Sequence, residues 1–276
     1  MGTTSLIKLY PPPNVSHSLD GVYLDHDIRS LAPPGQTYVY TNFIVSLDGR
    51  ISETDPDTGV RQVPSAMTND HDLKLFAELA AQSDVLLTSA RHLRAAAAGK
   101  YLNLLMLDDA LIEWRKDQGL VPQPRIAVVG QSLDFPLERL ADDLKARLLI
   151  ITTQDAPSHR LEALVREGIE VTIAAEGPSM TGRAIVDVLV RYQFYHVYSI
   201  AGPKLFRTLL EAKQLHRLYL TLAPMLIGGD GDSLMVGPRC NPPHGFRLVE
   251  LYFDPQTPPS TGQLFATFEP DISDHI

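Results

Sequence analysis

The feature that most restricts the fold is a short apolar run that recurs along the chain between segments with helical spacing. It occurs four times, at Asp84 to Thr88, Arg125 to Val129, Arg147 to Thr152 and His196 to Ile200. Runs of this length, rich in branched residues, are typical of strands buried on both faces of a sheet. Strands that alternate with helices form parallel sheets, so the pattern predicts an α/β protein.

Four further segments extend the predicted sheet. Tyr38 to Ser46 is rich in aromatic and branched residues and ends in an Asp-Gly turn, which predicts a central strand. Near the C-terminus, His216 to Leu222, Phe246 to Phe253 and Leu264 to Phe268 resemble strands with no helix-length segment between them. Because strands joined this way pair antiparallel, we expect a mixed, mostly parallel sheet, flanked by helices, with antiparallel strands at its C-terminal edge.

Helices are predicted where apolar residues recur at spacings of three and four. The clearest case includes the acidic pair Asp70 and Asp72, which suits the positive end of a helix. Pro203 fits the first position of another helix, because the N–H that proline lacks has no partner to lose there. The segments expected to be helical are Asp70 to Gln82, Tyr101 to Gln123, Arg160 to Glu167, Ala184 to Arg191 and Lys204 to Ala212.

Length and proline content suggest how the chain is divided. The 276 residues fit one large α/β domain, which we assign to residues 37–270. Residues 1–36 contain five prolines and scattered apolar side chains, so we expect an irregular extension that lies over the domain or over a partner subunit. Residues 271–276 are expected to form a short tail.

Composition excludes several classes of function. Lys and Arg total 24 against 33 Asp and Glu, a formal net charge of −9 with no basic run, so binding to DNA or RNA is not expected. The single cysteine, Cys240, cannot form a disulfide within the chain, and a reducing cytoplasm is the expected compartment. The longest apolar stretches are strand-sized, so no membrane span is predicted.

Common catalytic motifs are absent from the sequence. The nine histidines show neither His-x3-His nor His-Glu-x-x-His spacing, so no metal site is predicted. There is no Gly-x-Ser-x-Gly, no P-loop and no Gly-x-Gly-x-x-Gly between a strand and a helix. Interpretations as a common hydrolase, a P-loop protein or a Rossmann protein therefore have no support.

One candidate site is the turn that follows the first predicted strand. Asp48 and Gly49 form a common turn pair, and a plain structural turn explains them without any function. The functional alternative uses Asp48 as an acceptor and the Arg50 guanidinium as a donor to a polar heterocycle or a ribose. The sequence alone leaves both interpretations open.

A second candidate site combines the loops after three predicted strands. These loops are Thr88-Ser89-Ala90-Arg91, Gly130-Gln131-Ser132 and Ile200-Ala201-Gly202-Pro203-Lys204-Leu205. Each has an ordinary explanation, as a helix cap or a connector. In open α/β sheets, however, ligands bind outside the carboxyl ends of strands, and free N–H groups at a helix start suit a phosphate. The convergence of three such loops therefore favours nucleotide binding.

Five segments of the chain, taken in order, match the motifs of one known family. They are Asn42 to Ile51, Asp70 to Leu87, Pro124 to Val129, Ala201 to Pro203 and Leu220 to Gly229. From about Tyr38 to Phe268 the chain resembles the pyrimidine reductase of riboflavin biosynthesis, most specifically in Ser-Leu-Asp-Gly-Arg-Ile and Ala-Pro-Met-Leu-Ile-Gly-Gly. The resemblance implies a dihydrofolate-reductase-like fold, usually dimeric, that uses NADPH to reduce the ribosyl group of an aminopyrimidine ribose phosphate to ribityl.

The resemblance also implies roles for individual residues. Asp48 and Arg50 match the family's Asp-Gly-Lys/Arg turn, whose basic residue is thought to lie at the substrate, so both are expected to be catalytic. The NADPH ligands that it implies are Ser46, Thr88, Ser89, Ala90, Arg91, Gly130, Ser132, Ala201, Gly202, Pro203, Lys204 and Leu205. A homodimer is expected through the late strands, and the loop from Pro224 to Pro243 is expected to be functional or to face the partner copy.

The sequence departs from the family pattern at several positions. Ile200-Ala201 stands where members have Glu-Gly, Thr88 replaces a Gly, Arg91 replaces a Thr, and His216-Arg217 replaces an Asp-Glu pair. The missing glutamate removes a carboxylate that resembles a substrate ligand. Two alternatives follow. One keeps the fold and NADPH with another, dihydrofolate-like heterocyclic substrate; the other is a non-catalytic member that serves as a partner subunit.

Overall fold

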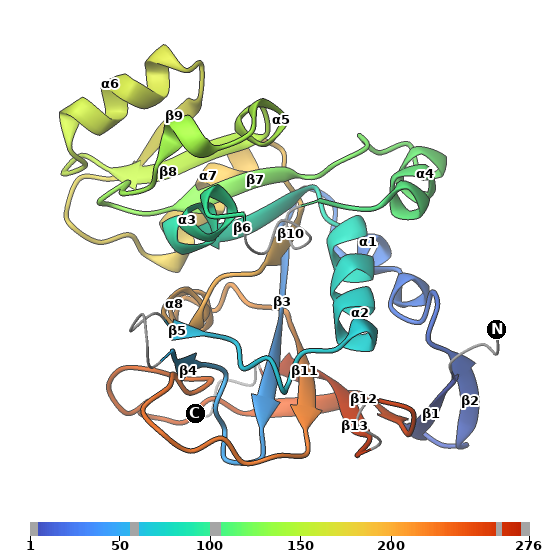
Figure 1. Cartoon of the computed structure of the whole chain (residues 1–276). Coiled ribbons are helices and arrows are strands. Elements are labelled where there is room, and N and C mark those ends of the chain that lie inside the picture. The colour runs from blue at the N-terminus through green and yellow to red at the C-terminus, as the bar shows by residue number, and fades with distance from the viewer. Residues whose placement is uncertain (1–4, 56–60, 100–105, 258–260, 272–276) are drawn as a thin grey trace. The chain divides into compact units, whose positions relative to one another are not determined.

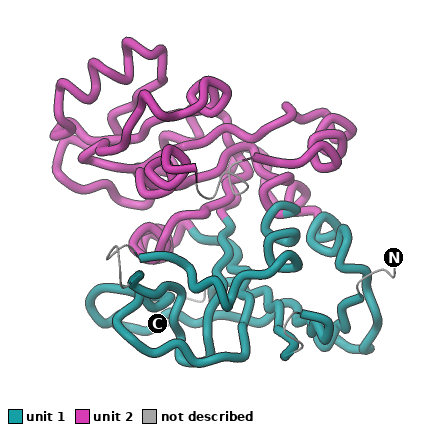
Figure 2. The backbone as a smooth tube through the Cα atoms, viewed as in Figure 1, with its two compact units in different colours: residues 1–26, 40–78, 215–276 teal, residues 27–39, 79–214 magenta. Residues whose placement is uncertain are grey.

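The computed structural model describes residues 5–55, 61–99, 106–257 and 261–271 (Figure 1). Its contacts divide the chain into two compact units (Figure 2). Unit 1 contains Met1–His26, Tyr40–Glu78 and Leu215–Ile276, and unit 2 contains Asp27–Val39 and Leu79–Gln214. Each unit therefore collects segments that are far apart in the sequence.

Unit 2 is built on five parallel strands. In spatial order they are β10 (His196–Ser199), β6 (Val85–Ser89), β7 (Arg125–Val129), β8 (Leu148–Thr153) and β9 (Glu170–Ala175). The first four confirm the strands predicted from the apolar runs. The sequence analysis missed β9, because this strand lies at the sheet edge with no fully buried residue and so lacks an apolar run.

Helices pack around these strands, and those at Ser158–Arg166, Gly182–Arg191 and Pro203–Glu211 confirm the helical spacing found in the sequence. They are α1 (Ile28–Leu31), α3 (Ala90–Ala97), α4 (Asp109–Asp117), α5 (Asp142–Lys145), α6 (Ser158–Arg166), α7 (Gly182–Arg191), α8 (Pro203–Glu211) and the 3-10 turn η3 (Leu137–Arg139). A Cβ on Gly182 would lie 2.5 Å from the Thr208 carbonyl oxygen, so α7 and α8 approach closely only because this residue is glycine. The helix predicted over Tyr101 to Gln123 is shorter, and residues 101–105 lie outside the described part.

Unit 1 contains a mixed sheet. Its strands, in spatial order, are β2 (Val15–Ser18), β1 (Ser5–Tyr10), β12 (Phe246–Asp254), β13 (Gln263–Pro270), β11 (Arg217–Ala223) and β3 (Tyr38–Ser46), which enters this unit at Tyr40. Only β11 and β3 pair parallel here; the other neighbours are antiparallel. This arrangement confirms both the strand at Tyr38–Ser46 and the predicted antiparallel strands of the C-terminal edge.

Helix α2 (Asp70–Ala81) begins in unit 1 as its sequence predicts. The Asn69 side chain accepts the Asp72 N–H at 3.0 Å, which caps the first turn, and the leading acidic residues suit the positive helix end. A small second sheet joins β4 (Glu53–Thr54) to β5 (Arg61–Gln62).

The prediction of an irregular N-terminal extension is wrong for the described residues. Strand β1 pairs with β12, β2 pairs with β1, and the 3-10 turn η1 (Leu24–His26) and α1 follow. The three consecutive prolines that suggested irregularity lie in the turn between β1 and β2, where they end a strand without preventing it. Leu6 is completely buried, so this hairpin belongs to the core. The single domain predicted over residues 37–270 stays a prediction, and the tail falls outside the described residues except for Asp271.

Candidate functional site

Three of the predicted loops lie next to one another in unit 2. They follow β10, β6 and β7, which are parallel neighbours, so their carboxyl ends share one edge of the sheet. The Ile200 N–H donates to the Leu87 carbonyl at 2.9 Å, which ties the loop after β10 to β6. A Cβ built on Gly130 would lie 4.0 Å from the Ala90 Cβ, which places the loop after β7 beside the start of α3.

The loop after β10 ends at the start of α8. Gly202 is the N-cap residue and makes no side-chain cap, and Pro203 occupies the first turn. A Cβ on Gly202 would meet no atom within 4 Å, so the space in front of this residue is open. Ala201 is buried and small, and Lys204 is exposed. An open helix N-terminus flanked by small residues fits a pyrophosphate, because the N–H groups and the helix dipole both favour an anion.

The loop after β6 contributes less than its sequence suggested. The Thr88 side chain is fully buried, and its hydroxyl oxygen lies 2.8 Å from Nδ1 of His92. Burial, together with the nearby Arg91 charge, lowers the pKa of His92 to about 4, so this imidazole is neutral near pH 7. Thr88 therefore positions α3. Ser89 is half-buried and Arg91 is exposed.

The loop after β7 presents small polar groups at the same edge. Gly130 is half-buried, and Gln131 and Ser132 are exposed. Leu133, next in the chain, is buried with φ of 51°. Its burial fixes the end of the loop while leaving the two polar side chains before it at the surface.

In unit 1, the turn after β3 is held by its own carboxylate. The Ser46 hydroxyl donates to Oδ1 of Asp48 at 2.5 Å, and the Ile227 and Gly228 N–H groups donate to Asp48 at 3.1 and 2.7 Å. The hydrogen bond from Ser46 and those from the two backbone N–H groups lower the pKa of Asp48 to about 2. Gly49 has φ of 78°, as a tight turn requires. Asp48 thus fixes the backbone of the loop after β11 to the turn after β3.

Arg50 is bound to the same loop. Its Nη1 donates to the Gly231 carbonyl at 2.6 Å, and Arg50 forms an isolated bridge with Ser233. A Cβ on Gly231 would lie 1.7 Å from the Ser52 carbonyl oxygen, so only glycine fits there. The two most specific motifs, Ser-Leu-Asp-Gly-Arg-Ile and Ala-Pro-Met-Leu-Ile-Gly-Gly, thus contact each other in the fold, which explains why they occur together. The sequence analysis missed Gly231, although the run of glycine and aspartate around it was a visible signal.

A buried carboxyl on α2 also escaped the sequence analysis. Asp72 is only 7% exposed, and its Oδ1 accepts the Thr221 hydroxyl at 2.6 Å. Burial raises the pKa of Asp72 to about 6, against the lowering effect of that hydrogen bond. An acidic residue near a helix start is expected on electrostatic grounds alone, so the sequence offered no sign that this one is buried.

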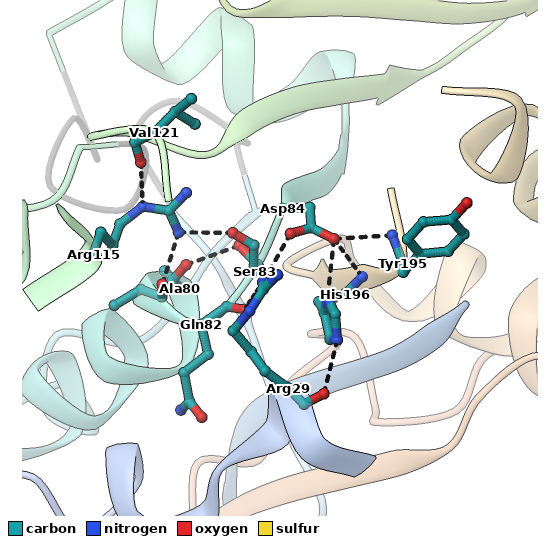
Figure 3. Close-up of polar contacts among 10 residues, drawn as sticks. Arg29, Ala80, Gln82, Ser83, Asp84, Arg115, Val121, Tyr195 and His196 are labelled. Carbon is teal, nitrogen blue, oxygen red and sulfur yellow. Dashed lines mark hydrogen bonds and ion pairs between the residues drawn. The ribbon is translucent and has the colours of Figure 1, made fainter. Parts of the chain in front are cut away.

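The opposite edge of the unit 2 sheet carries a different polar network (Figure 3). Oδ2 of Asp84 accepts the Tyr195 and His196 N–H groups and lies 3.0 Å from His196 Nδ1, and Oδ1 accepts from Arg29. Burial opposes ionisation, but the hydrogen bonds from His196 and Arg29 outweigh it and hold the pKa of Asp84 well below its usual range. Arg115 donates to the Ala81, Ser83 and Val121 carbonyls. These contacts join strand starts and a helix end, so we assign this network to stability.

Comparison with known proteins decides the family. The model of the family described as RibD C-terminal domain matches residues 37–251. The chain belongs to this family. The match confirms the resemblance found in the sequence. No curated relative matches the chain. Among the described residues, no helix is long and apolar enough to cross a bilayer, and no group of three or more potential metal ligands occurs.

Solved structures of RibD-type proteins share the fold. A pyrimidine reductase-like protein from Corynebacterium diphtheriae is 21% identical, with a TM-score of 0.69 over 85% of this chain and 92% of that one. Acinetobacter baumannii RibD is 15% identical, with a TM-score of 0.60, and this chain covers 59% of its length. The riboflavin biosynthesis reductase Rib7 of Saccharomyces cerevisiae is 13% identical, with a TM-score of 0.58 over 91% and 99%. The predicted fold class is therefore confirmed.

Proposed function

We propose that this RibD C-terminal domain protein is an NADPH-dependent reductase that converts the ribosyl group of an aminopyrimidine ribose phosphate to ribityl. The observation that carries the proposal is the line of three loops at neighbouring strand ends of unit 2, with open space in front of Gly202. This arrangement suits a dinucleotide, and the solved relatives include a riboflavin biosynthesis reductase.

Residues of unit 2 would hold the cofactor. The N-terminus of α8, with Ala201, Gly202, Pro203, Lys204 and Leu205, fits the pyrophosphate. Ser89 and Arg91 provide a hydroxyl and a cation for a phosphate, and Gly130 and Ser132 lie at the next strand end, where the family binds the adenosine ribose. NADPH, when bound, supplies a hydride. The protein contributes binding, orientation and the exclusion of water.

Asp48 and Arg50 act on the substrate side in this proposal. Asp48 holds the backbone of Ile227 and Gly228, so its role is to position the loop. Nη1 of Arg50 donates to the Gly231 carbonyl, and the other guanidinium N–H groups have no partner among the described residues. These remaining donors suit a planar acceptor such as a pyrimidine carbonyl or a phosphate.

One observation favours a second candidate function, a reductase of the same fold for a different heterocycle. Ile200 is buried where family members carry a glutamate, so this position can donate or accept no side-chain hydrogen bond. A lost charge-assisted hydrogen bond is typically ~1.5 to 3 kcal/mol, enough to change substrate preference. Measuring turnover of a ribosylaminopyrimidine phosphate and of a dihydropteridine side by side separates the two candidates.

We further propose a homodimer that packs through the unit 1 sheet. Val45, Leu222, Leu264, Phe253 and Ile7 are opposite one another in register across β3, β11, β13, β12 and β1. Residues directly opposite each other lie on the same face of a sheet, so these five side chains form one continuous apolar row. Three of them are half-buried, and Ile7 is 37% exposed. A second copy would cover such a row. Sedimentation velocity of the wild type and Ile7→Asp tests this: a wild-type monomer contradicts it.

Thermal denaturation with NADPH, with NADH and with buffer alone tests the function first. A cofactor at 100 times its Kd should stabilise the fold by about 2.7 kcal/mol, which a melting curve resolves. NADPH oxidation with the ribosylaminopyrimidine phosphate is then measured. The absence of both a melting shift and oxidation would refute the reductase and favour a non-catalytic partner subunit.

A further inference from the structure

We propose that His196, together with Asp84 and Arg29, forms a proton-controlled clamp on α1. The clamp holds this helix while both nitrogens of the His196 ring carry hydrogen, and it releases the helix when one of these hydrogens is lost. All three residues belong to unit 2 and are drawn in Figure 3. His196 begins β10 and is only 8% exposed, so its ring nitrogens depend on protein partners.

The partners of the two ring nitrogens of His196 determine its protonation. Nδ1 lies 3.0 Å from Oδ2 of Asp84, and Nε2 lies 3.2 Å from the backbone carbonyl oxygen of Arg29. A carbonyl oxygen can only accept a hydrogen bond, and the same is true of an ionised carboxylate. Burial opposes ionisation of Asp84, but the hydrogen bonds from His196 and Arg29 outweigh it and keep its pKa well below the usual range. Both ring nitrogens therefore donate, which requires a doubly protonated imidazolium.

His92, in the same unit, has a partner of a different kind. Its Nδ1 lies 2.8 Å from the Thr88 hydroxyl, which can donate a hydrogen bond as well as accept one. A neutral ring satisfies that contact, and burial together with the Arg91 charge lowers the pKa of His92 to about 4. A neutral ring at His196 would serve one of its two acceptors and turn a bare nitrogen towards the other.

The Arg29 carbonyl needs the histidine for a reason that is visible in the sequence. Arg29 lies in α1, and a helical carbonyl normally accepts from the N–H four residues later. That residue is Pro33, which has no N–H. The ring of His196 supplies a donor in its place. When the ring loses one hydrogen, the ionised Asp84 holds the remaining one on Nδ1, and the Arg29 carbonyl then faces a lone pair.

Helix α1 is too short to be stable without contacts of this kind. It has four residues, and its N-cap residue Asp27 makes no side-chain hydrogen bond to the helix. The Ile28 N–H donates to the Gln82 side chain at 2.9 Å, and the Arg29 guanidinium donates to Asp84 and to the Gln82 carbonyl. Release of the Arg29 carbonyl therefore lowers the stability of α1 against local opening.

The charged groups around the ring set the balance between its two forms. Among the described residues, Asp84 and Arg29 are the charged residues that contact it. Asp84 lies between α2 and β6 and also accepts the backbone N–H of Tyr195; its carboxylate stabilises the imidazolium, whereas the Arg29 guanidinium opposes it. Histidine side chains normally change charge between about pH 5 and 8, so the clamp is closed in acid and opens as the pH rises through this range.

The test follows the ring and the helix in the same sample. Protonation of the His196 ring is measured by ¹⁵N NMR from about pH 5.5 to 8.5, and hydrogen-exchange protection of the Ile28 and Ser30 amides is measured over the same range. Ile28 donates to Gln82 and Ser30 to the Asp27 carbonyl, so both amides report on α1. Protection, corrected for the intrinsic pH dependence of exchange, should fall roughly tenfold or more as the ring loses its hydrogen, the equilibrium effect of one hydrogen bond from a charged donor.

His196→Gln removes the titrating ring and keeps a polar side chain. In this variant the Ile28 and Ser30 amides should exchange fast at every pH, with no step between about pH 5.5 and 8.5. His159→Gln is the matched control, because His159 is an exposed histidine of the same unit, in α6. It should keep both the wild-type protection and its pH dependence.

Three results in the wild type would overturn the clamp. The first is a His196 ring that carries a single hydrogen at about pH 5.5, because its two acceptors require two. The second is loss of a ring hydrogen without a fall in the protection of Ile28 and Ser30. The third is a ring that stays doubly protonated up to about pH 8.5. A wild-type pH step in His196→Gln would overturn it as well, and the wild-type measurements decide the matter if that variant does not fold.

Discussion

Replacing Asp72 by Asn should stabilise the protein in alkaline solution. In the folded chain burial raises the pKa of this carboxyl from 3.8 to about 6. A carboxyl whose pKa is raised on folding binds its proton more tightly in the native state, so stability is highest below pH 3.8 and falls as the pH rises to about 6. The difference of about 2.2 pKa units at 1.36 kcal/mol each amounts to about 3 kcal/mol, with about half of it lost by pH 5.

Asparagine keeps an oxygen that accepts the Thr221 hydroxyl but carries no charge to desolvate. The expected gain at pH 8 is therefore about 3 kcal/mol, which for a chain of this size raises Tm by roughly 5 to 10 °C. Urea denaturation of the wild type and Asp72→Asn at pH 4, 5, 6 and 8 measures it. Asp48→Asn is the control, because the pKa of Asp48 is about 2 and its titration lies below this range.

The reasoning would be refuted if the wild type and Asp72→Asn showed the same change of unfolding free energy between pH 4 and 8.

Three further predictions use other parts of the molecule. Gly202→Val should weaken NADPH binding at least tenfold in a fluorescence titration with Tm unchanged, because the added side chain meets only open space; unchanged affinity would place the pyrophosphate elsewhere. Gly231→Ala should destabilise unit 1 by roughly 2 kcal/mol or more in chemical denaturation, because its Cβ would lie 1.7 Å from a carbonyl oxygen; a neutral result would show that the loop adapts freely. Burial disfavours ionisation of the Glu250 carboxyl, but the hydrogen bonds that it accepts from His26 and Lys8 outweigh burial and lower its pKa from 4.5 to about 2. Glu250 therefore stabilises the fold above pH 4.5, and this stability is lost as the pH falls towards 2. Glu250→Gln should therefore flatten the acid limb of a pH-dependent melting series, and an unchanged limb would contradict the pairing.

Sequence alone predicted much of unit 2, because its strands are buried on both faces and therefore read as apolar runs. The reliance on apolar runs also explains why β9 was not predicted, because its residues stay half-exposed at the sheet edge. The prediction for the N-terminal hairpin failed for another reason: β1 depends on pairing with β12, some 240 residues away, and its own composition does not mark it as a strand. The turn at Asp48 and the helix start at Pro203 were predictable because turn and cap preferences are local.

The sequence by itself determined the order of strands and helices, the chemistry of the turns and the family, because these depend on local periodicity and short motifs. The tertiary structure decided which polar groups meet. The Gly228 N–H donates to Asp48 across 180 positions, and the Thr221 hydroxyl donates to Asp72 across 149. Burial and hydrogen bonding set the pKa of a carboxyl, and both come from neighbours that only the folded chain brings together.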